Sequence, residues 1–321
     1  MNSIPIVCCF DENMILPAKV SLFALFQNAH PDTFYDVFII CRTNTITREQ
    51  KSEFKILTKH AFRHRISFIE INDFFENGHE VRNITIACYY RLQIPHIINQ
   101  INELHCTNYP KIIYLDIDTI PELDYWEIFS STTFDDDKWI AGVCETPLYA
   151  HDKAPIYMSE LGIDATTYIN SGFLIMDTEI LNRNHFFEKC LLHQNKKYVC
   201  QDQDIINIVC RGHIMLLPLK YNYTSILFTL SIHNEKFKHI KAAEIKDTVK
   251  SLVHYTGNKP WNSYCCRDYI WWHYYQQTPF FSPSLYFSHY IHTQKCFYNN
   301  IQTSLLIKEL KNRLKKKLRL K

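Results

Sequence analysis

The sequence predicts an α/β fold with a mainly parallel sheet between helices, followed by a small helical C-terminal extension. Two observations carry this prediction. Short apolar runs alternate with longer amphipathic stretches over residues 4–71, which is the spacing of successive strand and helix units in a parallel sheet. Residues 112–115 then form an apolar run that leads straight into Asp116 and Asp118, as expected of a strand that is buried on both faces and ends at a polar edge.

The N-terminal units follow from the hydrophobic pattern. Strands are predicted at residues 4–10, 37–41 and 65–71, and helices at residues 16–29 and 47–60. Thr47 is a residue type that favours the N-cap position, where its hydroxyl accepts from a free backbone N–H. These units predict three neighbouring strands whose carboxyl ends share one edge of the sheet.

The middle of the chain continues the same pattern. We expect a helix at residues 87–94, further strands at 139–143 and 173–176, and a helix at 201–210. That last helix opens with Gln201-Asp-Gln-Asp204. Acidic residues in a first helical turn also stabilise the helix dipole, so the quartet has a purely structural explanation as well.

The character of the sequence changes after residue 251. Residues 254–261 combine a histidine, a glycine and a lysine, and residues 264–280 are rich in Trp and Tyr. We expect the aromatic segment to be a helix that packs in a core. The predicted division is a catalytic domain at 1–262 and an extension at 263–321 that ends in a basic tail.

Composition excludes several classes of protein. Hydrophobic residues make up 46% of the 321 residues, as in a globular protein, and the six glycines form no glycine-rich phosphate loop. Residues 308–321 carry a charge of +7 within a net charge of +2, so the slightly acidic body argues against nucleic acid as a partner. The 12 cysteines include no C-x-x-C. With no signal segment and no long apolar run, we expect reduced thiols, a cytoplasmic location and no transmembrane helix.

Asp116 and Asp118 are candidate metal ligands. Side chains two residues apart point to the same side of an extended chain, and two carboxylates suit Mg²⁺ or Mn²⁺. The alternative is a loop whose aspartates cap a turn. Asp135-Asp-Asp137 is a denser acidic cluster, but no strand leads into it, so a solvated loop is expected there.

Six short motifs occur in a fixed order along the chain. They are Asp11-x-Asn13, Tyr90-Arg91, Leu115-Asp-x-Asp118, Asn170-x-Gly172, Gln201-Asp-Gln-Asp204 and His254-Tyr-x-Gly-x-Lys-Pro-Trp261. In this order they resemble the retaining glycosyltransferases of family 8, and within it the bacterial lipopolysaccharide glucosyl- and galactosyltransferases. The resemblance covers roughly residues 4–280, and its last motif is the most specific.

The resemblance implies a GT-A fold and a hexosyltransferase that takes glucose or galactose from a UDP-sugar. It implies Mn²⁺ or Mg²⁺ held by Asp116, Asp118 and His254, with Asp118, Asp202 and Gln203 as the catalytic group. Several binding roles are implied as well. Asp11 and Asn13 contact the uridine, Gly257 and Lys259 the diphosphate, and Arg91 the diphosphate or the donor sugar. Asp116 and Ile117 also bind the nucleotide-sugar, Asn170 and Asp202 bind sugar hydroxyls, and Gln203 lies beneath the anomeric carbon.

Two features qualify these implications. Gln203 is an amide and a poor nucleophile, which favours front-side displacement over a covalent intermediate. Met14 stands where the family commonly has an aromatic residue beside the uracil, although a thioether can also pack on a base. Alternatives to a lipopolysaccharide or lipooligosaccharide acceptor are a relative that glycosylates another acceptor, and an inactive nucleotide-sugar-binding protein at the membrane.

The C-terminal tail predicts a membrane contact. Leucines at 306, 310, 314 and 318 recur among lysines and arginines, which is the pattern of a basic amphipathic helix at an anionic bilayer surface. A solvated charged helix is the alternative. With a lipid-linked oligosaccharide as the implied acceptor, we expect peripheral association of residues 306–321 with the inner face of the plasma membrane.

Overall fold

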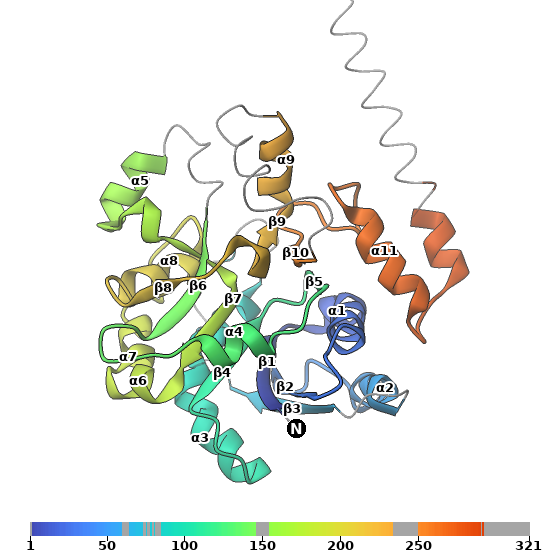
Figure 1. Cartoon of the computed structure of the whole chain (residues 1–321), viewed down its shortest axis with the longest axis horizontal. Coiled ribbons are helices and arrows are strands. Elements are labelled where there is room, and N and C mark those ends of the chain that lie inside the picture. Colours follow the sequence, from blue (N-terminus) through green and yellow to red (C-terminus); the bar gives the residue numbers. More distant parts are fainter. Residues whose placement is uncertain are drawn as a thin grey trace, which may run out of the picture.

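The structure, a computed structural model, is built around a twisted sheet with helices on both faces (Figure 1). It describes residues 2–59, 64–72, 75, 78, 80, 85–145, 154–233, 250–289 and 291. Within these residues the main sheet has seven strands. In spatial order they are β3 (Arg65–Ile71), β2 (Thr33–Arg42), β1 (Asn2–Cys9), β4 (Lys111–Leu115), β7 (Ile169–Asp177), β6 (Ile140–Cys144) and β8 (Ile214–Leu216).

The predicted strands are confirmed, and so is the mainly parallel sheet. β3, β2, β1 and β4 pair in parallel, whereas β7 runs antiparallel to both of its neighbours, β4 and β6. β1 and β4 at the centre are almost entirely buried, which explains their continuous apolar sequences. The carboxyl ends of β1 and β4 therefore share one edge of the sheet, where α/β proteins bind their ligands.

Helices cover both faces of the sheet. The labelled α-helices of the described residues are α1 (Ile15–Gln27), α2 (Arg48–Lys59), α3 (Ile94–His105), α4 (Trp126–Ser131), α5 (Ala154–Leu161), α6 (Thr178–Arg183), α7 (Phe186–Leu191), α8 (Gln201–Val209), α9 (Ser225–His233) and α11 (Asp268–Gln277). The 3₁₀ helices are η1 (Glu12–Met14), η2 (Ile86–Gln93), η4 (Ala165–Thr167) and η5 (Leu219–Tyr221).

Most of the predicted helices lie where expected. Thr47 caps α2 as predicted, and Gln50 returns the bond, since each side chain accepts from the other residue's backbone N–H. The expected helix at residues 87–94 is confirmed, although its type is 3₁₀ over most of its length. That stretch is the 3₁₀ helix η2, and the regular α-helix α3 starts only at Ile94, followed by Pro95 in its first turn, where a missing N–H costs nothing.

A second, small sheet lies beyond the end of β4. Within the described residues it contains β5 (Thr119–Pro121), β10 (Leu252–His254) and β9 (Tyr223–Thr224). β10 pairs antiparallel with β5, and the register sets His254 opposite Thr119. This pairing brings the histidine beside the residues that follow β4.

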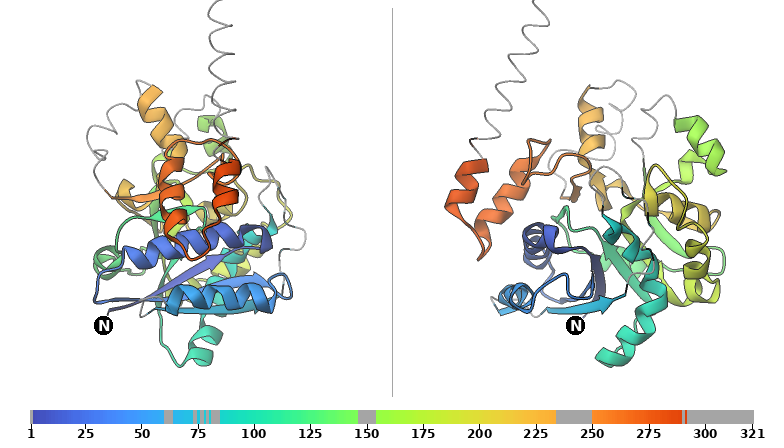
Figure 2. Two further views of the ribbon diagram at one scale, coloured as in Figure 1. Left: turned by 90° about the vertical axis from the view of Figure 1, so that its right-hand side faces the viewer. Right: turned by 180° about the vertical axis from the view of Figure 1, so that it is seen from behind.

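The aromatic C-terminal segment packs against the body of the protein. α11 shares a core cluster with α1, β5 and β10 that includes Val20, Val253, Trp271 and Tyr275, and Figure 2 shows it lying over α1. The expected aromatic core helix is thus confirmed, while the division at residue 262 stays a prediction. The tail at 306–321 lies outside the described residues. None of the described helices has the length and apolar run that crossing a bilayer requires.

Candidate active site

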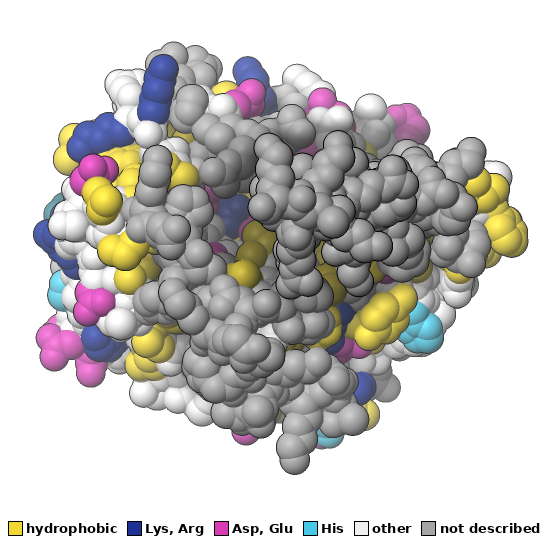
Figure 3. Space-filling view, turned by 90° about the horizontal axis from the view of Figure 1, so that it is seen from above, with side chains coloured by type: hydrophobic (Ala, Val, Ile, Leu, Met, Phe, Trp, Pro, Cys, Tyr) yellow, Lys and Arg dark blue, Asp and Glu magenta, His cyan; other side chains and the backbone are white. Residues whose placement is uncertain are grey.

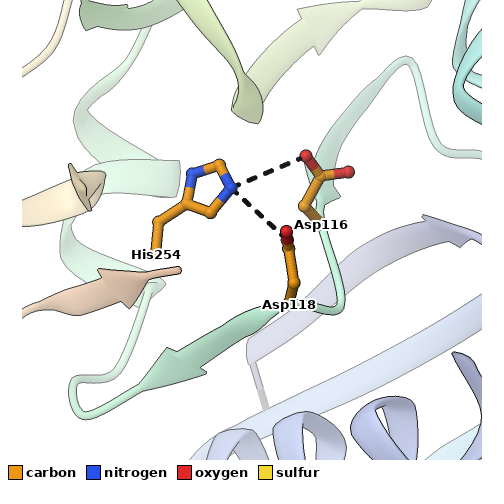
Figure 4. Close-up of side chains that lie close together, drawn as sticks. All are labelled: Asp116, Asp118 and His254. Atoms are coloured by element: carbon orange, nitrogen blue, oxygen red, sulfur yellow. Dashed lines mark ion pairs between the residues drawn. The ribbon is translucent and has the colours of Figure 1, made fainter. Parts of the chain in front are cut away.

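Asp116, Asp118 and His254 converge beyond the carboxyl end of β4 (Figure 4). One ligand atom from each residue lies within 4.8 Å of the others. The imidazole Nε2 is 3.3 Å from Asp118 Oδ1 and 4.0 Å from Asp116 Oδ2. His254 is buried and the two carboxylates are partly exposed, so the cluster opens to solvent on the carboxylate side.

Backbone pairing on three sides fixes this convergence. The Asp116 N–H donates to the carbonyl of Gly172 in β7, and the Tyr255 N–H donates to the carbonyl of Asp118. The β5–β10 register then holds His254 next to the same segment. The carboxylates thus leave a buried strand at a fixed point and meet an imidazole from a distant part of the chain.

Two cations flank the carboxylates. The Lys259 ammonium donates to Asp118 and to the Tyr255 carbonyl, the latter at 2.6 Å. Burial raises the pKa of Asp118, but Lys259 and His254 outweigh it and hold that pKa well below its ordinary value. Asp118 therefore stays ionised at neutral pH.

Arg91 is the second cation and lies beneath the site. Its guanidinium is 3.0 Å from Asp116 Oδ1 and 3.1 Å from Asp202 Oδ2, and it donates to the Ser171 carbonyl at 2.8 Å. The ring of Tyr114 covers it at 4.5 Å. Only 6% of the Arg91 surface is exposed. Its planar guanidinium, which lysine lacks, contacts the segment after β4, the helix α8 and the strand β7 at the same time.

The first turn of α8 lies against the same group. Burial raises the pKa of Asp202, and the charge of Arg91 partly offsets that rise. Gln203 Oε1 accepts from the Ser171 N–H at 3.0 Å, and its Nε2 donates to Tyr168 Oη at 3.2 Å. Asp204 has a structural role of another kind than the helix-dipole one considered for this quartet, because it accepts from the hydroxyls of Tyr157 and Tyr168.

Asn170 belongs to a hydrogen-bonded row that the motifs did not reveal. Its Nδ2 donates to the Glu145 carboxylate, and its Oδ1 accepts from Asn222 Nδ2 at 2.7 Å. Asn222 Oδ1 in turn lies 2.8 Å from His254 Nδ1. Burial raises the pKa of Glu145. Neither Glu145 nor Asn222 stands in a distinctive spacing, so a sequence pattern had no means of finding them.

The remaining predicted residues lie around this centre. Asp11 accepts from the Asn13 N–H at 3.0 Å and from Thr85 Oγ1 at 2.8 Å at the end of β1, and the Asn13 side chain is exposed. Ile117 packs in the core beneath the carboxylates. Gly257 has a φ of +86°, which favours glycine. The expectation of a solvated loop at 135–137 is confirmed, because all three aspartates are exposed.

The donor set fits a divalent cation. Carboxylate oxygens and an imidazole nitrogen suit Mn²⁺, and the carboxylates suit Mg²⁺. Seen from above, charged and hydrophobic side chains meet in a recess of the surface (Figure 3). A separate surface pocket at the start of β1, lined by Asn2, Asp124, Trp126 and Lys220, contains none of the predicted site residues.

Comparison with known proteins agrees with this architecture. The model of the family described as "Glycosyl transferase family 8" matches residues 5–265. A putative glycosyltransferase of Haemophilus influenzae is 24% identical over 254 residues, which are 77% of this chain and 69% of the relative. A lipopolysaccharide 1,2-glucosyltransferase of Escherichia coli is 24% identical over 158 residues, which are 48% of this chain and 45% of that protein.

One solved structure extends the comparison to three dimensions. The galactosyltransferase LgtC, solved with donor and acceptor sugar analogs, superposes with a TM-score of 0.71 at 21% identity. The match covers 88% of this chain and 98% of that one. The expected GT-A fold is thereby confirmed.

Proposed function

Because the chain belongs to glycosyl transferase family 8, we propose that it is a metal-dependent, retaining hexosyltransferase that uses a UDP-hexose as donor. The observation that carries the proposal is the convergence of Asp116, Asp118 and His254 beside Lys259. Mn²⁺ or Mg²⁺ bound there would neutralise the charge that develops on a departing diphosphate. The proposed donor sugar is glucose or galactose.

The charges of the site support a diphosphate ligand. The carboxylates of Asp116, Asp118 and Asp202 lie against two cations, Arg91 and Lys259, so the group carries at most one net negative charge. A divalent cation added to it creates a positive centre in a partly buried site, and a nucleoside diphosphate supplies the matching negative charge. Lys259 and the Gly257 backbone complete the proposed diphosphate contacts, while Asp11 and Asn13 hold the uridine.

The contacts of Gln203 bear on the proposed course of the reaction. Both polar atoms of its amide already bond to Ser171 and Tyr168, which fixes the side chain without making it a nucleophile. We favour front-side displacement, in which the acceptor hydroxyl forms the new bond to the anomeric carbon as the bond to UDP breaks. A β-phosphate oxygen takes the hydroxyl proton. Asp202 and Asn170 orient the sugar through its hydroxyls.

The proposed acceptor is the growing core of a lipopolysaccharide or lipooligosaccharide. The support is the resemblance to the lipopolysaccharide subgroup and the basic, leucine-bearing tail at residues 306–321, which suits an anionic bilayer surface. The proposed location is the inner face of the plasma membrane, on the cytoplasmic side, where such an acceptor is within reach.

A donor screen tests the proposal. The purified full chain is incubated with UDP-glucose, UDP-galactose, UDP-N-acetylglucosamine or GDP-mannose, with Mn²⁺ or with EDTA, and released nucleotide is measured. We expect metal-dependent release from one UDP-hexose, abolished by Asp118→Asn. Asp136→Asn, the same change in the exposed loop, is the matched control and keeps full activity. Absence of metal-dependent binding and release for all four donors refutes the proposal.

A further inference from the structure

We propose that Asn222 is a positioning residue that sets which nitrogen of His254 carries the proton, and so keeps Nε2 available for a divalent cation. The inference rests on the metal site of the proposed function. Asn222 lies between η5 and β9, is 1% exposed and contacts both Asn170 and His254. None of the six motifs contains it.

A backbone group determines the direction of this hydrogen-bonded row. The Gly172 N–H can only donate, and it lies 2.9 Å from Asn170 Oδ1, so the atom at that position must be the amide oxygen. Asn222 Nδ2 lies 2.7 Å from the same oxygen and must donate to it. Asn222 is therefore oriented with its own carbonyl oxygen toward His254.

The orientation of Asn222 fixes the imidazole. An amide oxygen only accepts, and Asn222 Oδ1 is 2.8 Å from His254 Nδ1, so the proton is on Nδ1. A neutral imidazole has a single N–H, and its lone pair is then on Nε2, the atom that faces Asp118 and Asp116. The opposite tautomer sets two acceptors against each other and turns an N–H toward the cation.

The hydrogen bond at the Glu145 end of this row runs in the same direction. Asn170 Nδ2 donates to the Glu145 carboxylate, which is consistent with the oxygen of Asn170 on the Gly172 side. Outer partners of this kind hold a metal-binding histidine in one tautomer and one ring orientation, and removing one typically weakens metal binding by about 10- to 100-fold. We expect an effect of this size at Asn222.

Two substitutions of similar volume separate orientation from packing. Asn222→Leu removes both hydrogen bonds, whereas Asn222→Asp keeps the acceptor for the His254 Nδ1–H and loses only the donor to Asn170 Oδ1. Asn102→Leu is the control, because Asn102 in α3 accepts from Tyr109 and Thr107 and touches no residue of the site. Mn²⁺ affinity of the full chain is measured by calorimetry. We expect about 10- to 100-fold weaker binding for Asn222→Leu and near wild-type binding for the other two.

A spectroscopic readout reports the tautomer itself. The ¹⁵N NMR spectrum of the histidine rings is recorded on the metal-free protein, because a cation bound at Nε2 would by itself hold the proton on Nδ1. Zn²⁺, which also accepts imidazole and carboxylate ligands, is then added as a second, diamagnetic cation. We expect a slowly exchanging Nδ1–H of His254 in wild type and Asn222→Asp, and its loss in Asn222→Leu. Wild-type affinity or a retained Nδ1–H in Asn222→Leu overturns the positioning role alone. A wild-type protein that binds neither cation overturns the metal site, and with it the proposed function.

Discussion

The absence of a side chain at Gly172 lets the His254 ring lie against β7, and an alanine at position 172 should prevent this close approach. A Cβ built at Gly172 would be 2.3 Å from His254 Cε1 and 2.7 Å from Nδ1. Favourable carbon contacts begin at about 3.5 Å, so the ring has to retreat by roughly 1.2 Å. Metal–ligand distances tolerate only about 0.2 Å. A divalent cation at this site would then be held by the two carboxylates without the imidazole.

The expected result for Gly172→Ala is a fall in Mn²⁺ affinity of about 10- to 100-fold, together with a loss of about 1–3 kcal/mol in the free energy of unfolding from overpacking. Calorimetry measures the first quantity and urea denaturation the second. Asp118 and Asp116 keep their own backbone anchors, so we expect weakened metal binding rather than none.

Gly142→Ala is the matched control. Its new methyl group would be 2.7 Å from Ile169 Cδ1, so it also crowds the core but touches no predicted metal ligand. We expect a comparable loss of stability with wild-type Mn²⁺ affinity. Unchanged affinity in Gly172→Ala would refute the reasoning, and so would an equal loss in both variants, which would attribute the effect to general destabilisation.

Three further predictions follow from other contacts. Lys259→Met should leave Mn²⁺ binding at least as tight as in wild type, because the ammonium group that competes for Asp118 is removed. The same variant should bind UDP about 10-fold more weakly or worse in calorimetry. Weaker binding of the metal alone would contradict this prediction. Burial lowers the pKa of His64 to about 4, and its Nδ1 accepts from the Tyr35 N–H, so its neutral form favours the fold. That contribution to stability is complete above about pH 6.5 and is lost as the pH falls toward 4. In urea titrations, the free energy of unfolding should fall by about 1–2 kcal/mol more for wild type than for His64→Asn over this range, after allowance for solvent screening. Identical pH profiles for the two proteins would contradict this prediction. Deleting residues 306–321 should move the protein from the membrane to the supernatant fraction while activity on a soluble acceptor mimic persists, and unchanged membrane recovery would count against a tail contact.

The hydrophobic pattern predicted the first half of the fold because its strands are short, continuous and buried on both faces. β1, β2 and β4 were recognisable for this reason, and Thr47 marked the start of α2 by capping chemistry. β5, β9 and β10 were not foreseen, since strands of two or three residues carry too few positions to show a period. Their pairing depends on contacts across the whole chain.

The candidate site divides in the same way. Asp116 and Asp118 were found because an apolar strand leads straight into them, which distinguishes them from the exposed aspartates at 135–137. His254 and Lys259 were found because the string at 254–261 resembles a family motif. Asn222 escaped notice, since a lone asparagine between tyrosines has no distinctive spacing. Arg91 was expected to face a ligand, and its contacts with Asp116, Asp202 and Ser171 became visible only in three dimensions.

The pairing of β5 with β10 has a consequence for the order in which the molecule assembles. Asp118 and His254 come from opposite ends of a long stretch of chain, so a ribosome-bound chain completes β4 well before β10 has been synthesised. Contacts between such distant segments form late. A cation that needs both segments therefore gives no help to the early steps of folding. Mn²⁺ should slow the unfolding of the finished protein and leave its refolding rate unchanged.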